Sequence, residues 1–303
     1  MLTVIALGGN ALTQPGEQGT AAEQRANLAA TFRAIAPLLE EGSIVVTHGN
    51  GPQVGNELLR HELASAEAPP LPLYLAVAQT QAEIGALIAA ELEPAARRPV
   101  AVVLTRVLVD EHDAAFKNPT KPVGPFYDAE RAKMLEGERG WAVKEDAGRG
   151  WRRVVPSPRP LAVLELDAVR TLLDQGVIVV AAGGGGVPVV ARDGRHDGID
   201  AVIDKDHASA LLALGLGAGR LVILTQVPAV YESFESDERR PLAELVPGRD
   251  DGLIEKLPAG SMRPKVEAAF RFVGETGGEA LITSADALER GEAGTRVVPA
   301  SKS

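Results

Sequence analysis

The sequence contains no cysteine, and aromatic residues make up only 4% of it. The absence of cysteine excludes disulfides, thiolate nucleophiles and cysteine-ligated zinc sites together, and it fits a reducing compartment. Uninterrupted apolar runs are short as well, since none reaches the roughly 18 residues that a membrane-spanning helix needs. We therefore expect a cytoplasmic protein that has no membrane partner and whose core is filled mainly by aliphatic side chains.

Positive charge is also scarce. The formal net charge is −10, from 31 Lys and Arg residues against 41 Asp and Glu residues. Nucleic acid binding needs a basic face that neutralises many phosphates, so we expect no nucleic-acid partner. Only 8 of the 31 basic residues are Lys. A Lys within a motif is therefore informative, because its compact, mobile charge is not reproduced by the planar guanidinium of Arg.

Short apolar runs alternate with helical patterns along most of the chain. This alternation predicts a parallel sheet that is covered by helices on both faces. Thr20 and Glu23 have the spacing of a capping box at the start of the first helix. We expect strands at 2–7, 44–47, 100–104, 177–181, 221–225 and 280–284, and helices at 20–39, 51–64, 73–92, 165–175, 204–214 and 264–275.

The stretch from about 111 to 160 departs from this alternation. It contains Trp141, Trp151, many charges and several prolines, but little periodicity of the kind that a buried strand or helix shows. We interpret it as an inserted subdomain. Further along, Asp193-Gly194 predicts the turn of a β-hairpin.

Three glycine-rich loops follow three of the predicted strands. They are Gly8-Gly9-Asn10, Gly49-Asn50-Gly51 and the run of glycines from Gly183 to Gly186. Glycine lets the backbone approach an anion closely, and parallel strands place such loops together at their carboxyl ends. None of the three has the pattern of a P-loop or of a dinucleotide fingerprint, which disfavours the common NTPase and dehydrogenase classes.

Three lysines lie in unusual surroundings. Lys121 stands in the proline-rich stretch 118–125, Lys205 lies at the start of a predicted helix, and Lys265 follows Pro264 at another helix start. Each also has a structural explanation: a solvated loop, an acidic helix start, and the ordinary preference of Pro for the first helical turn. We interpret His48 as a structural hydrogen-bonding residue rather than a catalytic one.

Seven motifs together resemble the carbamate kinases. The likeness runs from the first strand almost to the C-terminus. The motifs are LGGNAL at 7–12, THGNGPQVGN at 47–56, NPTKPVGPFY at 118–127, RRVVPSPRP at 152–160, GGGGVPV at 183–189, AVIDKDHAS at 201–209 and SMRPKVEAA at 261–269.

The resemblance implies the amino-acid-kinase fold, an open, mainly parallel central sheet between helical layers. By this resemblance, residues 1–215 form an N-terminal lobe with the carbamate site and a protruding subdomain at about 111–160, and residues 216–303 form the nucleotide-binding lobe. It also implies a homodimer that acts in arginine metabolism. The expected reaction interconverts ATP and carbamate with ADP and carbamoyl phosphate, with Mg²⁺ bridging the nucleotide phosphates.

The resemblance also assigns roles to individual residues. Lys121, Lys205, Asp206 and Lys265 would be catalytic, with Asp206 holding the ammonium groups of Lys205 and Lys265. The substrate would be bound by Gly8, Gly9, Asn10, Gly49, Asn50 and Gly51, and the nucleotide by Gly183, Gly184, Lys205, Lys265 and Tyr231. No protein side chain is expected to be a dedicated metal ligand, as is common for Mg²⁺.

The chemistry of the reaction agrees with this set. Phosphoryl transfer depends on positioning and on charge neutralisation, and carbamate is already an anion, so no general base is required. Two features depart from the family pattern in the nucleotide lobe. Arg263 stands where related proteins commonly have Gly, and Thr225-Gln226-Val227-Pro228 replaces a more acidic stretch.

Two alternative functions stay open from the sequence. One is another small-molecule kinase of the same fold, such as acetylglutamate kinase or aspartokinase. Those relatives usually have a Lys just ahead of the first glycine pair, where this chain has Ala6-Leu7. The other is a non-catalytic sensor of nucleotide or carbamoyl phosphate, which we would expect to have lost one of the four charged residues.

Overall fold

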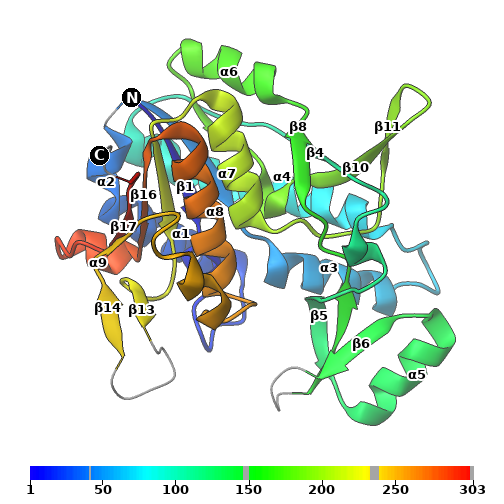
Figure 1. The fold of residues 1–303 in the computed structure, drawn as a ribbon. Coiled ribbons are helices and arrows are strands. Elements are labelled where there is room, and N and C mark those ends of the chain that lie inside the picture. Colours follow the sequence, from blue (N-terminus) through cyan, green and yellow to red (C-terminus); the bar gives the residue numbers. More distant parts are fainter. Residues whose placement is uncertain (41, 146–149, 233–238, 301–303) are drawn as a thin grey trace.

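An eight-stranded sheet forms the centre of the fold in the computed structural model, which describes residues 1–40, 42–145, 150–232 and 239–300 (Figure 1). Its strand order is β15-β17-β16-β12-β1-β2-β9-β3. All neighbouring strands run parallel except β16 and β17. The strands are β1 Leu2–Leu7, β2 Ser43–His48, β3 Val100–Val102, β9 Ile178–Val180, β12 Arg220–Leu224, β15 Glu244–Leu245, β16 Glu279–Thr283 and β17 Thr295–Val297. The predicted mainly parallel sheet is confirmed.

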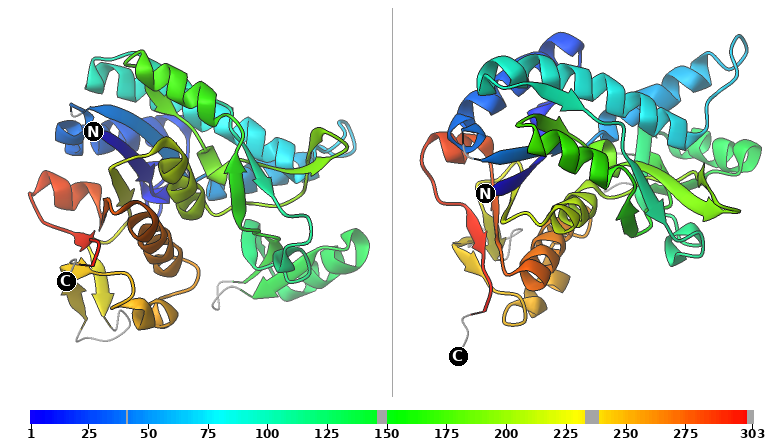
Figure 2. Two further views of the ribbon diagram at one scale, coloured as in Figure 1. Left: turned by 45° about the horizontal axis from the view of Figure 1, so that its top comes forward. Right: turned by 90° about the horizontal axis from the view of Figure 1, so that it is seen from above.

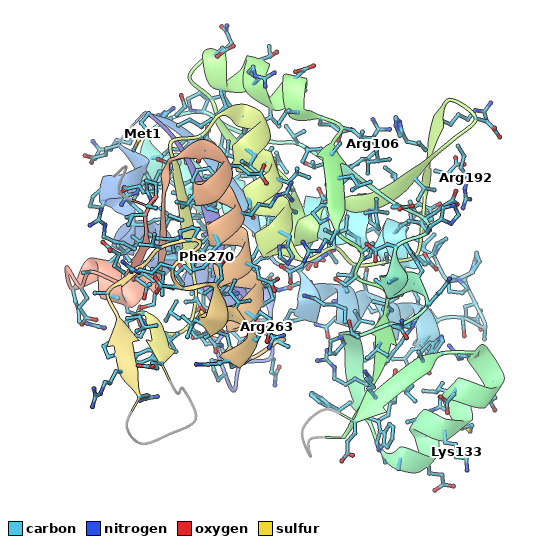
Figure 3. The ribbon with its side chains drawn as sticks, viewed as in Figure 1. Met1, Arg106, Lys133, Arg192, Arg263 and Phe270 are labelled. Atoms are coloured by element: carbon cyan, nitrogen blue, oxygen red, sulfur yellow. The ribbon has the colours of Figure 1, made fainter. Side chains whose placement is uncertain are left out.

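Helices cover both faces of this sheet. Alternate residues of β1 point to opposite faces, so Ile5 packs with one helical layer and Val4 with the other. The first layer contains α1 Ala21–Ala34, α2 Ala36–Leu39, α4 Leu73–Ala96 and α9 Ala285–Glu289. The second contains α6 Leu166–Asp174, α7 Lys205–Leu216 and α8 Met262–Thr276. The view from above in Figure 2 shows the sheet between these layers, and Figure 3 marks Phe270 on α8.

The first predicted helix is correct at its start and wrong at its end. The Thr20 side chain accepts from the backbone N–H of Glu23, and the Glu23 carboxylate accepts in return from the Thr20 backbone, so the capping box is confirmed. The helix does not continue to residue 39. It ends at Ala34, and a separate turn, α2, follows with Pro37 near its start. Proline has no backbone N–H, so it cannot continue the hydrogen-bond ladder of α1.

Helix α4 is the one described helix that is long and apolar enough to cross a bilayer, by length and composition alone. Its inward face, which includes Ile84, Ile88 and Leu92, is fully buried against the sheet and α1. A core helix of a globular protein has these properties, so the candidate span is weak support for a membrane. The absence of a membrane partner stays a prediction.

A second sheet extends from the body on the side of α4. Its strand order is β11-β10-β4-β8, from Arg195–Gly198, Val187–Arg192, Arg106–Val109 and Pro160–Val163. Strands β10 and β11 form the predicted hairpin. Asp193 and Gly194 have φ values of 47° and 75° at its tip, as a two-residue turn with left-handed backbone requires.

The stretch that was predicted as an inserted subdomain projects to one side of the main sheet (Figures 1 and 2). Although its sequence shows little periodicity, the stretch folds into a three-stranded antiparallel sheet of its own. The sheet has the order β5-β7-β6, from Lys121–Tyr127, Trp151–Val155 and Ala142–Glu145, and α5 Ala129–Arg139 packs on it. The register shifts between Val123 and Tyr127, and this irregularity breaks the alternation that reveals a strand in the sequence.

The remaining elements are short, apart from α3. A hairpin of β13 Val230–Glu232 and β14 Arg240–Leu242, which the sequence did not predict, precedes a short helical segment, η4, at Asp251–Lys256. Further short turns are η1 Gly9–Ala11, η2 Ala114–Phe116 and η3 Gly183–Gly185, and α3 spans Gly51–Leu63. The division into lobes at residue 215 stays a prediction, since the main sheet runs through both parts.

Candidate active site

The three glycine-rich loops meet at the carboxyl ends of β1, β2 and β9. Together with residues from β5, α7 and α8 they surround a cleft of about 190 Å³. Five predicted loop residues and the four predicted charged residues line it. They are Gly9, Gly49, Asn50, Gly51 and Gly184 from the loops, and Lys121, Lys205, Asp206 and Lys265. The sequence therefore identified residues that the fold brings together from positions more than 250 apart in the chain.

The third loop packs closely against the second. Gly184 has a left-handed backbone with φ of 63°, and a Cβ atom there would collide with the side-chain amide of Asn50. At Gly183 a Cβ atom would collide with the His48 ring. Gly183 was predicted to contact the nucleotide, but it is buried and does not line the cleft. Gly183 therefore allows close packing against the His48 ring.

His48 and Asn50 hold the second loop in shape. His48 is buried, and its Nδ1 lies 2.9 Å from the carbonyl oxygen of Gly49. Burial lowers the pKa of His48 to about 4, so the ring is neutral near pH 7 and its Nδ1–H can donate to that carbonyl. The Asn50 amide donates to Thr80 Oγ1 at 2.9 Å. These contacts suit the structural role that we expected of His48.

Two ammonium groups share one buried carboxylate in the cleft. Lys205 Nζ lies 2.5 Å from Asp206 Oδ1, and Lys265 Nζ lies 2.9 Å from Asp206 Oδ2. The side chains of the two lysines are only 12% and 13% exposed, and that of Asp206 is 3% exposed. The three charges sum to +1, so the cluster offers a net positive charge to an anion in the cleft.

The ionisation of this cluster follows from its geometry. Burial alone would raise the pKa of Asp206, but the two lysines outweigh it and hold the pKa well below its usual range. Burial lowers the pKa of Lys205, and Asp206 opposes that shift. For Lys265 the carboxylate outweighs burial, and the pKa is raised. Asp206 therefore stays ionised and keeps both amines within reach of the same point.

The third lysine comes from the protruding subdomain. Lys121, the first residue of β5, donates to Asp204 Oδ2 at 2.8 Å. Asp204 also caps α7, because its Oδ1 accepts from the backbone N–H of Asp206 at 2.9 Å. Burial would raise the pKa of Asp204, but Lys121 outweighs this and the pKa is lowered.

Asp204 was not among the site residues predicted from the sequence. An Asp at this position is favoured as an ordinary helix cap, so its type gave no sign of a second partner. The only hint was its place between Ile203 and Lys205 in a motif that already held two charged residues of interest.

A second cleft of about 360 Å³ adjoins the first and shares Gly9, Ser261 and Lys265 with it. Gly8 and Asn10 also line it, and the Asn10 side chain accepts a hydrogen bond from the Gln226 amide. Gly9 of the first loop therefore lines both clefts, whereas Gly8 and Asn10 line the second cleft.

Tyr231 borders a smaller, mainly apolar hollow of about 160 Å³ beside the second cleft. Its other walls come from 225–227, Leu257, Pro258, Ser261 and Met262. Gln226 therefore lines both the hollow and the second cleft. An apolar slot next to a polar cleft has the form that a planar base attached to phosphates would fit.

Arg263, which departs from the family pattern, lies at the start of α8 (Figure 3). Its guanidinium donates to the carbonyl oxygens of Glu255 at 2.6 Å and Leu257 at 3.2 Å. It lines none of the three cavities described above. The substitution therefore ties α8 to η4 rather than adding charge to a cleft.

In the described residues, neither cleft has a cluster of side chains arranged to bind a metal ion. Within the described ranges, no group of three or more His, Asp or Glu side chains converges on one point. Both oxygens of Asp206 contact lysines, and both oxygens of Asp204 accept hydrogen bonds. A Mg²⁺ ion that is held mainly by phosphate oxygens and water fits this arrangement, whereas an all-protein site does not.

Similarity to known proteins covers almost the whole chain. Residues 1–284 match the amino acid kinase family. The chain is 46% identical over 314 residues to the carbamate kinase of Pyrococcus furiosus, with 98% of each chain covered. The carbamate kinase from Giardia lamblia bound to AMP-PNP superposes with a TM-score of 0.89 at 39% identity, over 98% of both chains. The Giardia enzyme thiocarbamoylated by disulfiram on a cysteine gives a TM-score of 0.87 at 39% identity, again over 98% of both chains. The chain therefore belongs to the amino acid kinase family and, within it, to the carbamate kinases.

Proposed function

We propose that this chain transfers a phosphoryl group between ATP and carbamate in the cleft around Lys205, Asp206 and Lys265. The observation that carries the proposal is the sharing of one buried carboxylate by two lysines where three glycine loops meet. Such a site supplies fixed positive charge and backbone N–H groups, and these are the main requirements of phosphoryl transfer.

In this proposal the substrates occupy adjoining cavities. Carbamate lies in the first cleft, beneath Lys121 and against the loop Gly49–Gly51. The nucleotide phosphates reach along the second cleft past Gly8, Gly9 and Asn10, and the base enters the hollow beside Tyr231. The binding of AMP-PNP by the Giardia relative supports a nucleotide site in this chain.

The reaction requires no proton transfer to begin. An anionic oxygen of carbamate attacks the γ-phosphorus of ATP, the bond from that phosphorus to the bridging oxygen breaks, and ADP leaves. Lys205 and Lys265 stabilise the negative charge on the transferring group and on the leaving oxygen. Lys121 would bring a further positive charge to the acceptor side if its ammonium group left Asp204 and contacted the substrate.

Mg²⁺ belongs to the proposal as the partner of the nucleotide. When bound, it would neutralise charge on the β- and γ-phosphates. In the first cleft the carboxylates of Asp204 and Asp206 are already engaged by lysines and by a helix N–H, so we assign neither of them to the ion. The homodimer and the place in arginine metabolism are further parts of the proposal, and they rest on the resemblance to carbamate kinases. The cytoplasmic location is also part of the proposal, and it rests on the composition of the sequence.

Of the alternative functions, another kinase of this fold is disfavoured by the similarity to carbamate kinases, such as that of Pyrococcus furiosus at 46% identity over nearly the full chain. A sensor without activity is disfavoured because Lys121, Lys205, Asp206 and Lys265 are all present around one cleft. A dehydrogenase would need a dinucleotide fingerprint, which none of the glycine loops supplies.

The proposal is tested by a coupled assay of ATP formation from ADP and carbamoyl phosphate, with and without Mg²⁺. We expect Mg²⁺-dependent ATP formation. In the opposite direction, faster phosphorylation of acetylglutamate or aspartate than of carbamate would overturn the assignment.

A further inference from the structure

Glu62 joins the body of the protein to the protruding subdomain. It lies near the end of α3, and its side chain is only 11% exposed. Tyr127 donates to Glu62 Oε2 at 3.3 Å, and Arg131 donates to Oε1 at 3.1 Å. The Arg139 guanidinium lies 3.8 Å from the same Oε1. One carboxylate of the body therefore takes three partners from β5 and α5.

These contacts are directional, and the one from Tyr127 keeps its proton near neutral pH. Burial and the Glu62 carboxylate raise the pKa of Tyr127 to about 12, so its hydroxyl keeps the proton that it donates. A charged acceptor strengthens each hydrogen bond relative to a neutral one. Arg139 also stacks on Trp141, with its guanidinium carbon 5.4 Å from the ring centroid, so this partner is held by a second contact.

Helix α3 and strand β5 lie alongside each other from the cleft to Glu62. At the cleft, Gly51 begins the helix and Lys121 begins the strand, and both line the cavity. In the middle, Gly55 meets Gly124 so closely that a Cβ atom on Gly55 would lie 3.1 Å from the Gly124 backbone. At the far end, Glu62 meets Tyr127.

The lengths of the two elements match. A helix rises about 1.5 Å per residue, so Gly51 and Glu62 are about 17 Å apart along its axis. A strand rises about 3.3 Å per residue, so Lys121 and Tyr127 are about 20 Å apart. The glycine contact in the middle has no directional bond between side chains. The position of the strand along the helix is thus set most specifically by the carboxylate at the far end.

We propose that Glu62 is a positioning residue for the phosphoryl transfer reaction: by fixing β5 along α3, it sets where the Lys121 ammonium stands over the cleft. Glu62 itself touches no substrate. The inference rests on the proposed role of Lys121, and it adds the part of the body that determines where the subdomain delivers this charge.

The test compares Glu62→Gln with Glu57→Gln. Both residues lie on α3, but Glu57 pairs with Arg60 of the same helix rather than with the subdomain. We expect Glu62→Gln to lower turnover roughly five- to tenfold, the size of effect seen when residues of one network are uncoupled. ADP affinity, measured by calorimetric titration, should change less than about twofold, and Glu57→Gln should match the unmodified chain in both measurements. Unchanged turnover in Glu62→Gln would overturn the inference.

A second pair of measurements separates positioning from a general structural role. In a Lys121→Ala background, adding Glu62→Gln should cost less than about twofold further, because the group that Glu62 positions is gone. If Glu62→Gln costs as much turnover in this background as it does in the chain that keeps Lys121, Glu62 acts independently of Lys121. A parallel fall in ADP affinity would show general disruption. Either result would overturn the inference.

Tyr127→Phe provides a milder variant if Glu62→Gln folds poorly. It removes one hydrogen bond to the same carboxylate and keeps the ring. We expect a smaller loss of turnover in the same direction, which again disappears in the Lys121→Ala background. If Lys121→Ala alone leaves turnover unchanged, the proposed role of Lys121 fails and this inference fails with it. If Lys121→Ala lowers turnover but the Glu62 and Tyr127 variants leave it unchanged, the proposed function stands and this inference does not.

Discussion

Lys121 donates to Asp204, the residue that caps helix α7, across a distance of 2.8 Å. The lysine comes from the protruding subdomain, and the helix begins with Lys205 and Asp206 of the charged cluster. The ion pair therefore joins the subdomain, which in our proposal covers the acceptor side of the cleft, to the start of α7, which in our proposal carries the phosphate-binding charge. Its disruption should affect catalysis more than nucleotide binding.

Lys121→Ala removes the donor of this ion pair. We expect turnover to fall by a factor on the order of 10², because a charge that acts on the transition state is lost. ADP binding, which in our proposal uses the adjoining cavities, should change little in calorimetric titration. Equal losses in both measurements would place Lys121 at the nucleotide or in the folding of the chain, and unchanged turnover would make it an ordinary solvated lysine.

Asp204→Asn removes the negative charge of the acceptor in the same ion pair. Asn caps a helix about as well as Asp, so α7 should keep its start and the unfolding midpoint should shift only slightly. The charge that holds Lys121 is lost, and we expect turnover to fall about tenfold, as for a broken hydrogen-bonded ion pair of this kind. The matched Asp204→Ala should lose the cap as well and unfold with about 1 kcal/mol less free energy. If Asp204→Asn keeps full turnover, the ion pair has no part in the reaction.

The buried His48 makes the stability of the fold sensitive to acid. Its pKa is lowered from 6.5 to about 4, so the folded chain binds fewer protons than the unfolded chain between these values. The stabilisation is complete above pH 6.5 and is lost as the pH falls toward 4, by up to about 3 kcal/mol in the free energy of unfolding. His48→Gln should keep most activity and should show a smaller loss of stability between pH 6.5 and 4.5.

Chemical denaturation of both chains at these two pH values measures the difference. The same slope in the unmodified chain and in His48→Gln would show that another group causes the acid sensitivity. A collapse of activity in His48→Gln comparable with that of the lysine variants would show that the imidazole takes part in catalysis.

Disulfiram should leave this chain unmodified. The Giardia enzyme is thiocarbamoylated on a cysteine, and this chain has no cysteine at all. After incubation with disulfiram we expect an unchanged intact mass and unchanged turnover. An added thiocarbamoyl group, seen by mass spectrometry, would mean that another nucleophile of this chain reacts.

The sequence predicted the centre of the fold well. Strands such as Leu2–Leu7 are continuous apolar runs because both of their faces are buried, and this pattern depends only on local composition. Glycine loops after such strands must gather at one edge of a parallel sheet, so the approximate place of Gly9, Asn50 and Gly184 also followed from the chain.

Features that depend on contacts between distant segments could not be predicted in the same way. Asp204 has the sequence environment of a helix cap, and only the folded chain places the Lys121 ammonium beside it. Glu62 is one of the two acidic residues of α3, and only the folded chain brings Tyr127 and Arg131 to it. Gly183 stands in a glycine run that points to a ligand, but the buried His48 ring explains its lack of a side chain.

In the proposed reaction, positive charge held by Asp206 stabilises the transferring phosphoryl group, and a substitution of Lys205 tests this role most directly. The measurement is the coupled assay of ATP formation from ADP, carbamoyl phosphate and Mg²⁺ for Lys205→Ala, beside Lys256→Ala, which removes an exposed lysine of η4. We expect Lys205→Ala to lower turnover by a factor on the order of 10² to 10³, while the control keeps full activity. A change in Lys205→Ala of only a few-fold would contradict this account.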